Sequence, residues 1–165
     1  MRRKSYSYTE MAGLDKSVRW YLIANRTEAR FYKDVPGTHF TLMEKLLNAE
    51  GDLKNRELET DRPGRGYSSA NTTERHAYES HSNHHEEVLK KFVHEVADKL
   101  SSIVDSDHSA EFVFAVDPTF LGYLRKALSS EVSSRVKHEI KHEYKDYSNQ
   151  DQKLYEQIQS ALKKA

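Results

Sequence analysis

The chain has 165 residues, of which 36% are hydrophobic, which is enough for one compact core. Lysine plus arginine and aspartate plus glutamate both total 26, so net charge indicates neither a nucleic-acid nor a membrane partner, and any such partner must be met by a local patch. The absence of cysteine excludes disulfides and thiolate metal sites, and it fits a reducing compartment.

The N-terminal segment, residues 1–16, begins with basic residues, but the apolar stretch of a secretory signal does not follow them. We expect this segment to be a flexible extension and residues 17–165 to form one domain. No apolar run reaches the length of a membrane span. The expectation is therefore a cytoplasmic protein without membrane contact.

Three strands are predicted in the first part of the domain. VRWYLIAN, Val18–Asn25, is nearly continuous in β-branched and aromatic residues, as a buried strand is. ARFYKDV, Ala29–Val35, predicts a second strand, and the short connection implies an antiparallel hairpin. A turn signal at Pro36–Thr38 separates this hairpin from HFTLMEKLLN, His39–Asn48, which predicts a third strand.

The chain becomes polar and poor in aliphatic residues at about Glu50, which predicts a long mobile loop over about 50–82. Within it, DRPGRGYSS combines glycines, which allow close approach to a ligand, with arginines, which suit phosphate or carboxylate, and a tyrosine that can stack on a base. The spacing fits neither a P-loop nor a dinucleotide fingerprint, and a simple soluble loop is the alternative interpretation. The predicted ligand-binding residues are Arg62, Gly64, Arg65, Gly66, Tyr67 and Ser68.

The second half of the chain alternates helix and strand. EFVFAVDP predicts a short buried strand, and Pro118 suits the first turn of a helix that Ser129–Ser130 interrupts. NQDQKLYEQIQSALKKA predicts a C-terminal amphipathic helix. Before these, a long helix is predicted from about Asn83 by apolar residues at helical spacing, namely Val88, Leu89, Phe92, Val96, Leu100 and Val104.

The segment VKHEIKH, Val136–His142, matches the H-E-x-x-H zinc motif, which needs both imidazoles on one face of a helix. Here charged residues occupy every second position, a period of two that describes a strand with one solvated face. On a strand, His138 and His142 would be about 13 Å apart, too far to share a metal. A helical interpretation survives in one apolar row spaced by four, formed by Val132, Val136, Ile140 and Tyr144.

A second histidine cluster lies where the long loop meets the helix, at His76, His81, His84 and His85. With no cysteine nearby and no regular carboxylate spacing, we interpret these as surface histidines capable of adventitious metal binding.

Several segments carry a family resemblance: IANRTEARFYK, DRPGRGYSS, the helix around FVHEVADKL, FVFAVDPTFLGYLRKAL and VKHEIKHEY. Together, from about Trp20 to Leu162, they resemble the bacterial host attachment protein family. The most specific part is Pro118–Arg125, which is similar to the family's aromatic/proline–x–x–Leu–Gly–x–Leu–Arg signature. In that family the segment that matches VKHEIKHEY is a strand. The family name records a role in adhesion to host cells and describes no chemical activity.

More remotely, the family is similar to the middle domain of archaeal and eukaryotic class I release factors and of Pelota. The release factors carry a Gly-Gly-Gln loop that enters the ribosomal peptidyl-transferase centre. The loop in the similar place here reads Gly64-Arg65-Gly66-Tyr67, without Gly-Gly-Gln. The resemblance therefore leaves contact with the ribosome or RNA, without hydrolysis, as the expectation.

We expect an α/β fold, with one domain built on a mixed five-stranded sheet and helices on both faces. Three antiparallel strands come first, followed by two strands that alternate with helices. The expected function is a non-enzymatic binding protein that needs no cofactor or metal and contacts the ribosome or RNA through residues 61–69. The alternatives are a zinc-dependent hydrolase that uses His138, Glu139 and His142, and a surface factor that acts directly in adhesion. The oligomeric state stays open.

Overall fold

The structure is a computed structural model that describes residues 18–34, 40–51, 74–141 and 151–164. It contains one mixed sheet of five strands in the order β3-β2-β1-β4-β5, so the predicted α/β architecture is confirmed. The strands are β1 (Arg19–Ala24), β2 (Glu28–Asp34), β3 (Thr41–Leu47), β4 (Glu111–Val116) and β5 (Val136–Lys141).

The first three strands form an antiparallel unit, and the last two add to it in parallel. β1 and β2 pair along their whole length, from Arg19 opposite Asp34 to Ala24 opposite Ala29. β2 pairs with β3 through a register shift at Phe31/Tyr32. β4 lies parallel to β1, and β5 lies parallel to β4. The carboxyl ends of three parallel strands therefore meet at one edge of the sheet.

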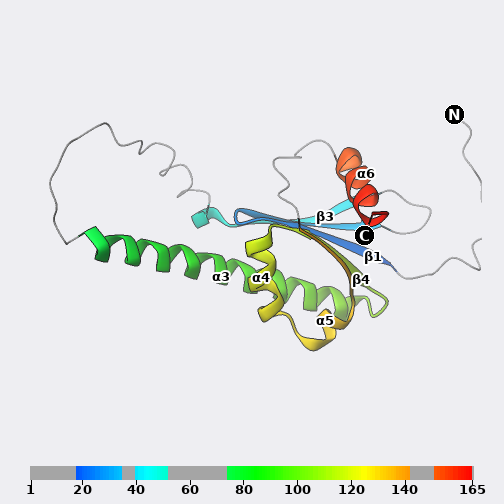
Figure 1. The fold of residues 1–165 in the computed structure, drawn as a ribbon. Helices are drawn as coiled ribbons and strands as arrows, with labels where there is room; N and C mark the ends of the chain where they lie inside the picture. The colour runs from blue at the N-terminus through cyan, green and yellow to red at the C-terminus, as the bar shows by residue number, and fades with distance from the viewer. Residues whose placement is uncertain (1–17, 35–39, 52–73, 142–150, 165) are drawn as a thin grey trace, which may run out of the picture.

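Helices cover both faces of the sheet, as predicted (Figure 1). The helices α3 (Glu74–Ser106), α4 (Pro118–Ala127) and α5 (Ser130–Ser134) lie on one face, and α6 (Asp151–Leu162) lies on the other. Two successive crossovers, β1 to β4 and β4 to β5, run in the same direction across the sheet. Because such crossovers are right-handed, they place their helices on the same face. None of the helices described is long and apolar enough to cross a membrane.

The start of α3 corrects one prediction. The helix begins at Glu74 and not at about Asn83, so residues 74–82 belong to a helix and not to the predicted loop. The residues between contain no proline or glycine, and once a helix is nucleated each added residue gains a hydrogen bond. Residues 49–51 are also helical. The rest of the predicted loop, residues 52–73, and the predicted extension, residues 1–16, lie outside the described residues.

The larger core lies between the sheet and α3, α4 and α5. Leu22, Phe112 and Phe114 from the central strands pack with Leu100 of α3 and Leu124 of α4, all fully buried. β1 and β4 are covered on both faces, which explains why their sequences are continuous apolar runs without alternation.

A smaller core lies under α6, where Leu154 and Ile158 pack on the sheet. Tyrosine hydrogen bonds surround this contact. The Tyr32 hydroxyl donates to Asp151 Oδ1 at 2.8 Å, and the Tyr155 hydroxyl donates to Asp34 Oδ2 at 3.2 Å. Burial, with the nearby carboxylate of Asp151, raises the pKa of Tyr32 to about 12. α6 is therefore attached by a mixture of apolar and titratable contacts.

Candidate ligand pocket between α3 and α4

The carboxyl edge of the sheet is held together by backbone hydrogen bonds between distant parts of the chain. Asp117 N–H donates to the carbonyl of Ala24, which joins the ends of β4 and β1. In the β1–β2 turn, the Asn25 side-chain oxygen accepts from the N–H groups of Thr27 and Glu28 at 2.8 and 2.9 Å. This is an Asx turn, in which the asparagine side chain replaces backbone contacts.

The segment after β3 is tied to the same turn. Asn48 N–H donates to the Thr27 carbonyl at 2.7 Å, and Asn48 Nδ2 donates to the Arg26 carbonyl at 2.9 Å. Gly51 packs closely here, since a Cβ at this position would lie 2.7 Å from Asn48 Nδ2 and 3.0 Å from the Arg26 carbonyl oxygen. The close approach requires glycine.

α4 begins at this edge for clear local reasons. The Asp117 carboxylate accepts from Phe120 N–H at 2.9 Å, and Pro118 occupies the first turn, where its missing N–H costs nothing. One side of the helix is buried in the core through Phe120, Leu121 and Leu124. The cap and the buried side together fix which residues α4 presents to α3.

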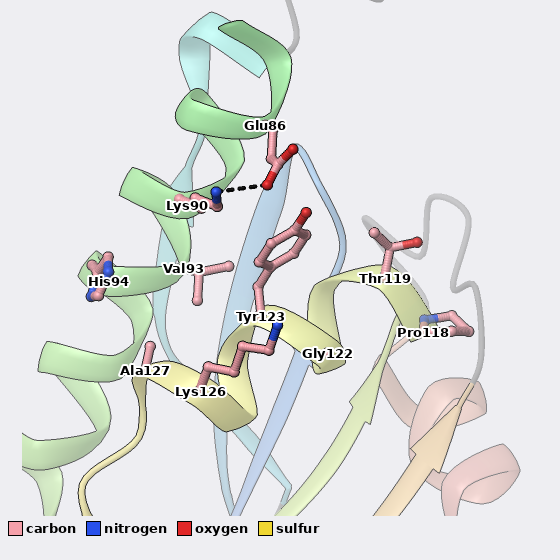
Figure 2. Close-up of a pocket in the computed structure, with 10 residues that line it drawn as sticks. All are labelled: Glu86, Lys90, Val93, His94, Pro118, Thr119, Gly122, Tyr123, Lys126 and Ala127. Atoms are coloured by element: carbon pink, nitrogen blue, oxygen red, sulfur yellow. Dashed lines mark ion pairs between the residues drawn. The ribbon is translucent and has the colours of Figure 1, made fainter. Parts of the chain in front are cut away.

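A pocket of about 590 Å³ lies between α3 and α4 (Figure 2). Its volume is within the usual range for sites that hold small ligands. Its position beyond the end of β4 is where open α/β sheets generally bind ligands. α3 contributes Glu86, Lys90, Val93 and His94, and α4 with its flanking residues contributes Pro118, Thr119, Gly122, Tyr123, Lys126 and Ala127.

Tyr123 is the central side chain of the pocket and is partly buried. The ammonium groups of Lys90 and Lys126 lie 5.8 and 6.0 Å from its ring centroid, within the range of cation–π attraction. Lys90 also forms an ion pair with Glu86 at 2.6 Å. The hydrogen bond from Lys90, helped by one from Tyr123, lowers the pKa of the Glu86 carboxyl. The pair is exposed, so it contributes little to stability.

Lys126 differs from Lys90 because it forms a salt bridge with no carboxylate in the part of the chain that is described. Arg26, also exposed, reaches Thr119 Oγ1 with a weak hydrogen bond of 3.4 Å. The pocket thus combines an aromatic ring, a carboxylate already bonded to one lysine, and a second lysine with capacity to bind an anion.

Gly122 leaves a bare stretch of helix in the pocket wall. A Cβ at this position would meet no atom within 4 Å. Glycine in a helix interior costs about 1 kcal/mol relative to alanine, and here no steric need offsets that cost. The sequence reasoning did not assign these pocket residues, although a glycine inside a predicted helix was a usable signal.

The H-E-x-x-H segment forms a strand, as its period of two predicted. Val136–Lys141 is β5, and His138 lies opposite Val113 in the sheet. Glu139 pairs with Arg125 of α4, whose Nε donates to Glu139 Oε1 at 3.1 Å and whose NH2 group also bonds the carboxylate. The helical geometry that the zinc motif requires is therefore not formed by these residues, and His142 lies outside the described ones.

The other predicted site residues are mostly beyond what the structure describes. Arg62, Gly64, Arg65, Gly66, Tyr67 and Ser68 all fall within residues 52–73. Of the second histidine cluster, His84 and His85 are exposed on α3, and the side chains of His76 and His81 are not described. Across residues 18–34, 40–51, 74–141 and 151–164, no group of three or more metal-binding side chains is arranged to hold an ion.

Comparison with known proteins places the chain in a family. Two solved structures are similar over most of this chain: one titled "Archaeal protein" (11% identity, TM-score 0.44, 95% of this chain and 41% of that one) and the archaeal translation termination factor aRF1 (11%, 0.45, 91% and 40%). This chain therefore spans about two fifths of their length. No curated protein matches its sequence. The family model described as "Protein required for attachment to host cells" matches residues 20–155, and the chain belongs to that family.

Proposed function

We propose that the protein is a non-enzymatic, cytoplasmic binding protein whose partner is RNA, with the ribosome as its main source. The contacts come from Arg62, Gly64, Arg65, Gly66, Tyr67 and Ser68 together with the pocket between α3 and α4. The observation that supports this most directly is the pairing of the Tyr123 ring with Lys90 and Lys126. Aromatic rings flanked by cations are what single-stranded nucleic acids bind, because bases stack and phosphates need positive charge.

The position of the pocket also supports the proposal. The described chain stops at Gly51, which packs against Arg26, and Arg26 in turn reaches Thr119 of the pocket. It resumes in α3, the helix whose residues Glu86 and Lys90 line the pocket wall. The segment with the predicted RNA-binding arginines therefore departs from the same edge of the sheet at which the pocket lies.

The charge distribution agrees with a local contact. The chain has equal numbers of acidic and basic residues, so attraction to phosphates has to come from a patch. Arg26 and Lys126 are exposed and lie near this edge. The absence of cysteine fits a reducing, cytoplasmic location.

Ribosome co-sedimentation over a range of salt concentrations tests this proposal. The double variant Arg62→Ala/Arg65→Ala should bind ribosomes and labelled single-stranded RNA more weakly at every sequence. Each lost phosphate contact removes released counterions, so the slope of log affinity against log salt should become shallower by about 1.5. RNase treatment should remove the protein from lysate complexes.

The matched control is Lys163→Ala/Lys164→Ala, which removes two positive charges from the C-terminal end of α6, on the other face of the sheet. This control should pellet as the wild type does. If the wild type stays in the supernatant at low salt and does not bind labelled RNA, the RNA function is wrong. Equal loss in the control and the double variant would show that only overall charge matters.

A further inference from the structure

We infer that the pocket between α3 and α4 is a binding site for one nucleoside phosphate unit, either a free nucleotide or one residue of an RNA strand, and that Gly122 leaves the room for its base. In the second form the inference rests on the proposed RNA function and specifies which part of the RNA the pocket takes. The argument uses Gly122, Tyr123, Lys126 and the ends of α4.

Gly122 is not required by the fold. α4 is capped at both ends, by Asp117 at its start and by Leu128 N–H bonding back to Leu124 at its end, so an alanine would sit in a regular helix. The open space around a Cβ at Gly122 means that a methyl group would clash with nothing described. The glycine therefore weakens the helix without a structural return, and what it provides is a flat backbone surface in the pocket wall.

The neighbouring groups suit the two parts of a nucleotide. The Tyr123 ring and the bare backbone at Gly122 lie side by side on α4 and offer a surface for a flat base. Lys126, one turn beyond Gly122, forms no described salt bridge and is the cation with capacity for a phosphate. The Glu86 carboxylate, held ionised by Lys90, can accept from a base amino group or a ribose hydroxyl.

A purely apolar ligand fits these groups less well. It would cover Lys126 and the Glu86–Lys90 pair without replacing their contacts with water, and unpaired charges are costly to desolvate. A phosphate alone would leave most of the pocket unfilled, because the apolar wall of Val93, Ala127 and the Tyr123 ring has no partner in it. A ligand with both a flat ring and an anionic group uses the whole lining.

The test is titration of the full chain with AMP, UMP and inorganic phosphate by NMR, and with a labelled 12-residue RNA by fluorescence anisotropy. Gly122→Ala should raise the folding equilibrium constant about two- to fivefold, because alanine favours the helix. The same variant should weaken nucleotide or RNA binding at least tenfold, because its methyl group occupies the place of the base. A variant that gains stability and loses binding cannot be explained by misfolding.

Two further variants separate the parts of the site. Lys126→Ala should weaken nucleotide binding about tenfold, and Tyr123→Phe should retain binding that Tyr123→Ala loses. Ser102→Ala is the control, since it removes a helix-disfavouring residue from an exposed position of α3 outside the pocket. It should leave binding unchanged.

The outcomes distinguish this inference from the proposed function. Tight RNA binding that Gly122→Ala and Lys126→Ala both weaken supports the pocket with RNA as the source. Nucleotide binding at these residues without any RNA or ribosome binding supports the pocket with a free nucleotide, and the RNA function falls. RNA binding that neither variant changes overturns the pocket inference and leaves the RNA function standing. No binding of any of the four probes overturns both.

Discussion

The attachment of α6 to the sheet should make stability fall steeply at alkaline pH. Tyr32 is fully buried, its hydroxyl donates to Asp151, and burial raises its pKa from 10.0 to about 12. In the unfolded chain the same group ionises near pH 10. Its contribution is therefore fully present below pH 10 and is lost as the pH rises towards 12, because the unfolded state then releases a proton that the folded state keeps.

The size of this effect follows from the two pKa values. At pH 11.5 the difference corresponds to a loss of about 2 kcal/mol in the free energy of unfolding from Tyr32 alone. Urea denaturation at pH 9 and pH 11.5 measures it, and Tyr32→Phe supplies the comparison because phenylalanine cannot ionise. The variant should be less stable at pH 9, having lost the hydrogen bond to Asp151, and should lose about 2 kcal/mol less between the two pH values. An equal fall in both proteins would refute the reasoning.

Two further predictions concern the core and the rejected zinc site. Leu100→Ala, at a fully buried position of α3 against the sheet, should lower the free energy of unfolding by about 2–5 kcal/mol in urea denaturation, whereas Ser102→Ala should not lower it. Glu139→Gln breaks an exposed ion pair with Arg125 and should cost less than about 1 kcal/mol. Elemental analysis of the wild type should find no stoichiometric zinc, and one tightly bound zinc lost in His138→Ala would contradict the strand interpretation.

The parts of the fold that could be predicted are those in which local pattern and burial agree. β1 is buried on both faces, so its apolar run is continuous, and β5 has one solvated face, so its charged residues alternate. The start of α3 could not be predicted from apolar spacing, because residues 74–82 continue a helix whose apolar stripe begins only at Val88. Helix propagation past the last core contact leaves no period to detect.

The pocket could not be predicted because its two walls are far apart in sequence. Glu86 and Lys90 come from α3, whereas Tyr123 and Lys126 come from α4, and β4 lies between the two helices in the chain. Only the crossover that packs both helices on the same face brings them together. The residues predicted instead, at 61–69, are contiguous, which is the kind of site that composition alone can indicate.

The segment Pro118–Arg125, which carries the family signature, shows how the fold and the pocket divide one helix. Pro118 starts the helix, and Arg125 bonds Glu139 of β5. Three of its residues fill the core, namely Phe120, Leu121 and Leu124. The fold thus accounts for these five positions. It does not account for Thr119, Gly122 or Tyr123, and all three line the pocket. The residues of this segment that folding leaves unexplained are those that a ligand would touch, which is the strongest reason to look for one there.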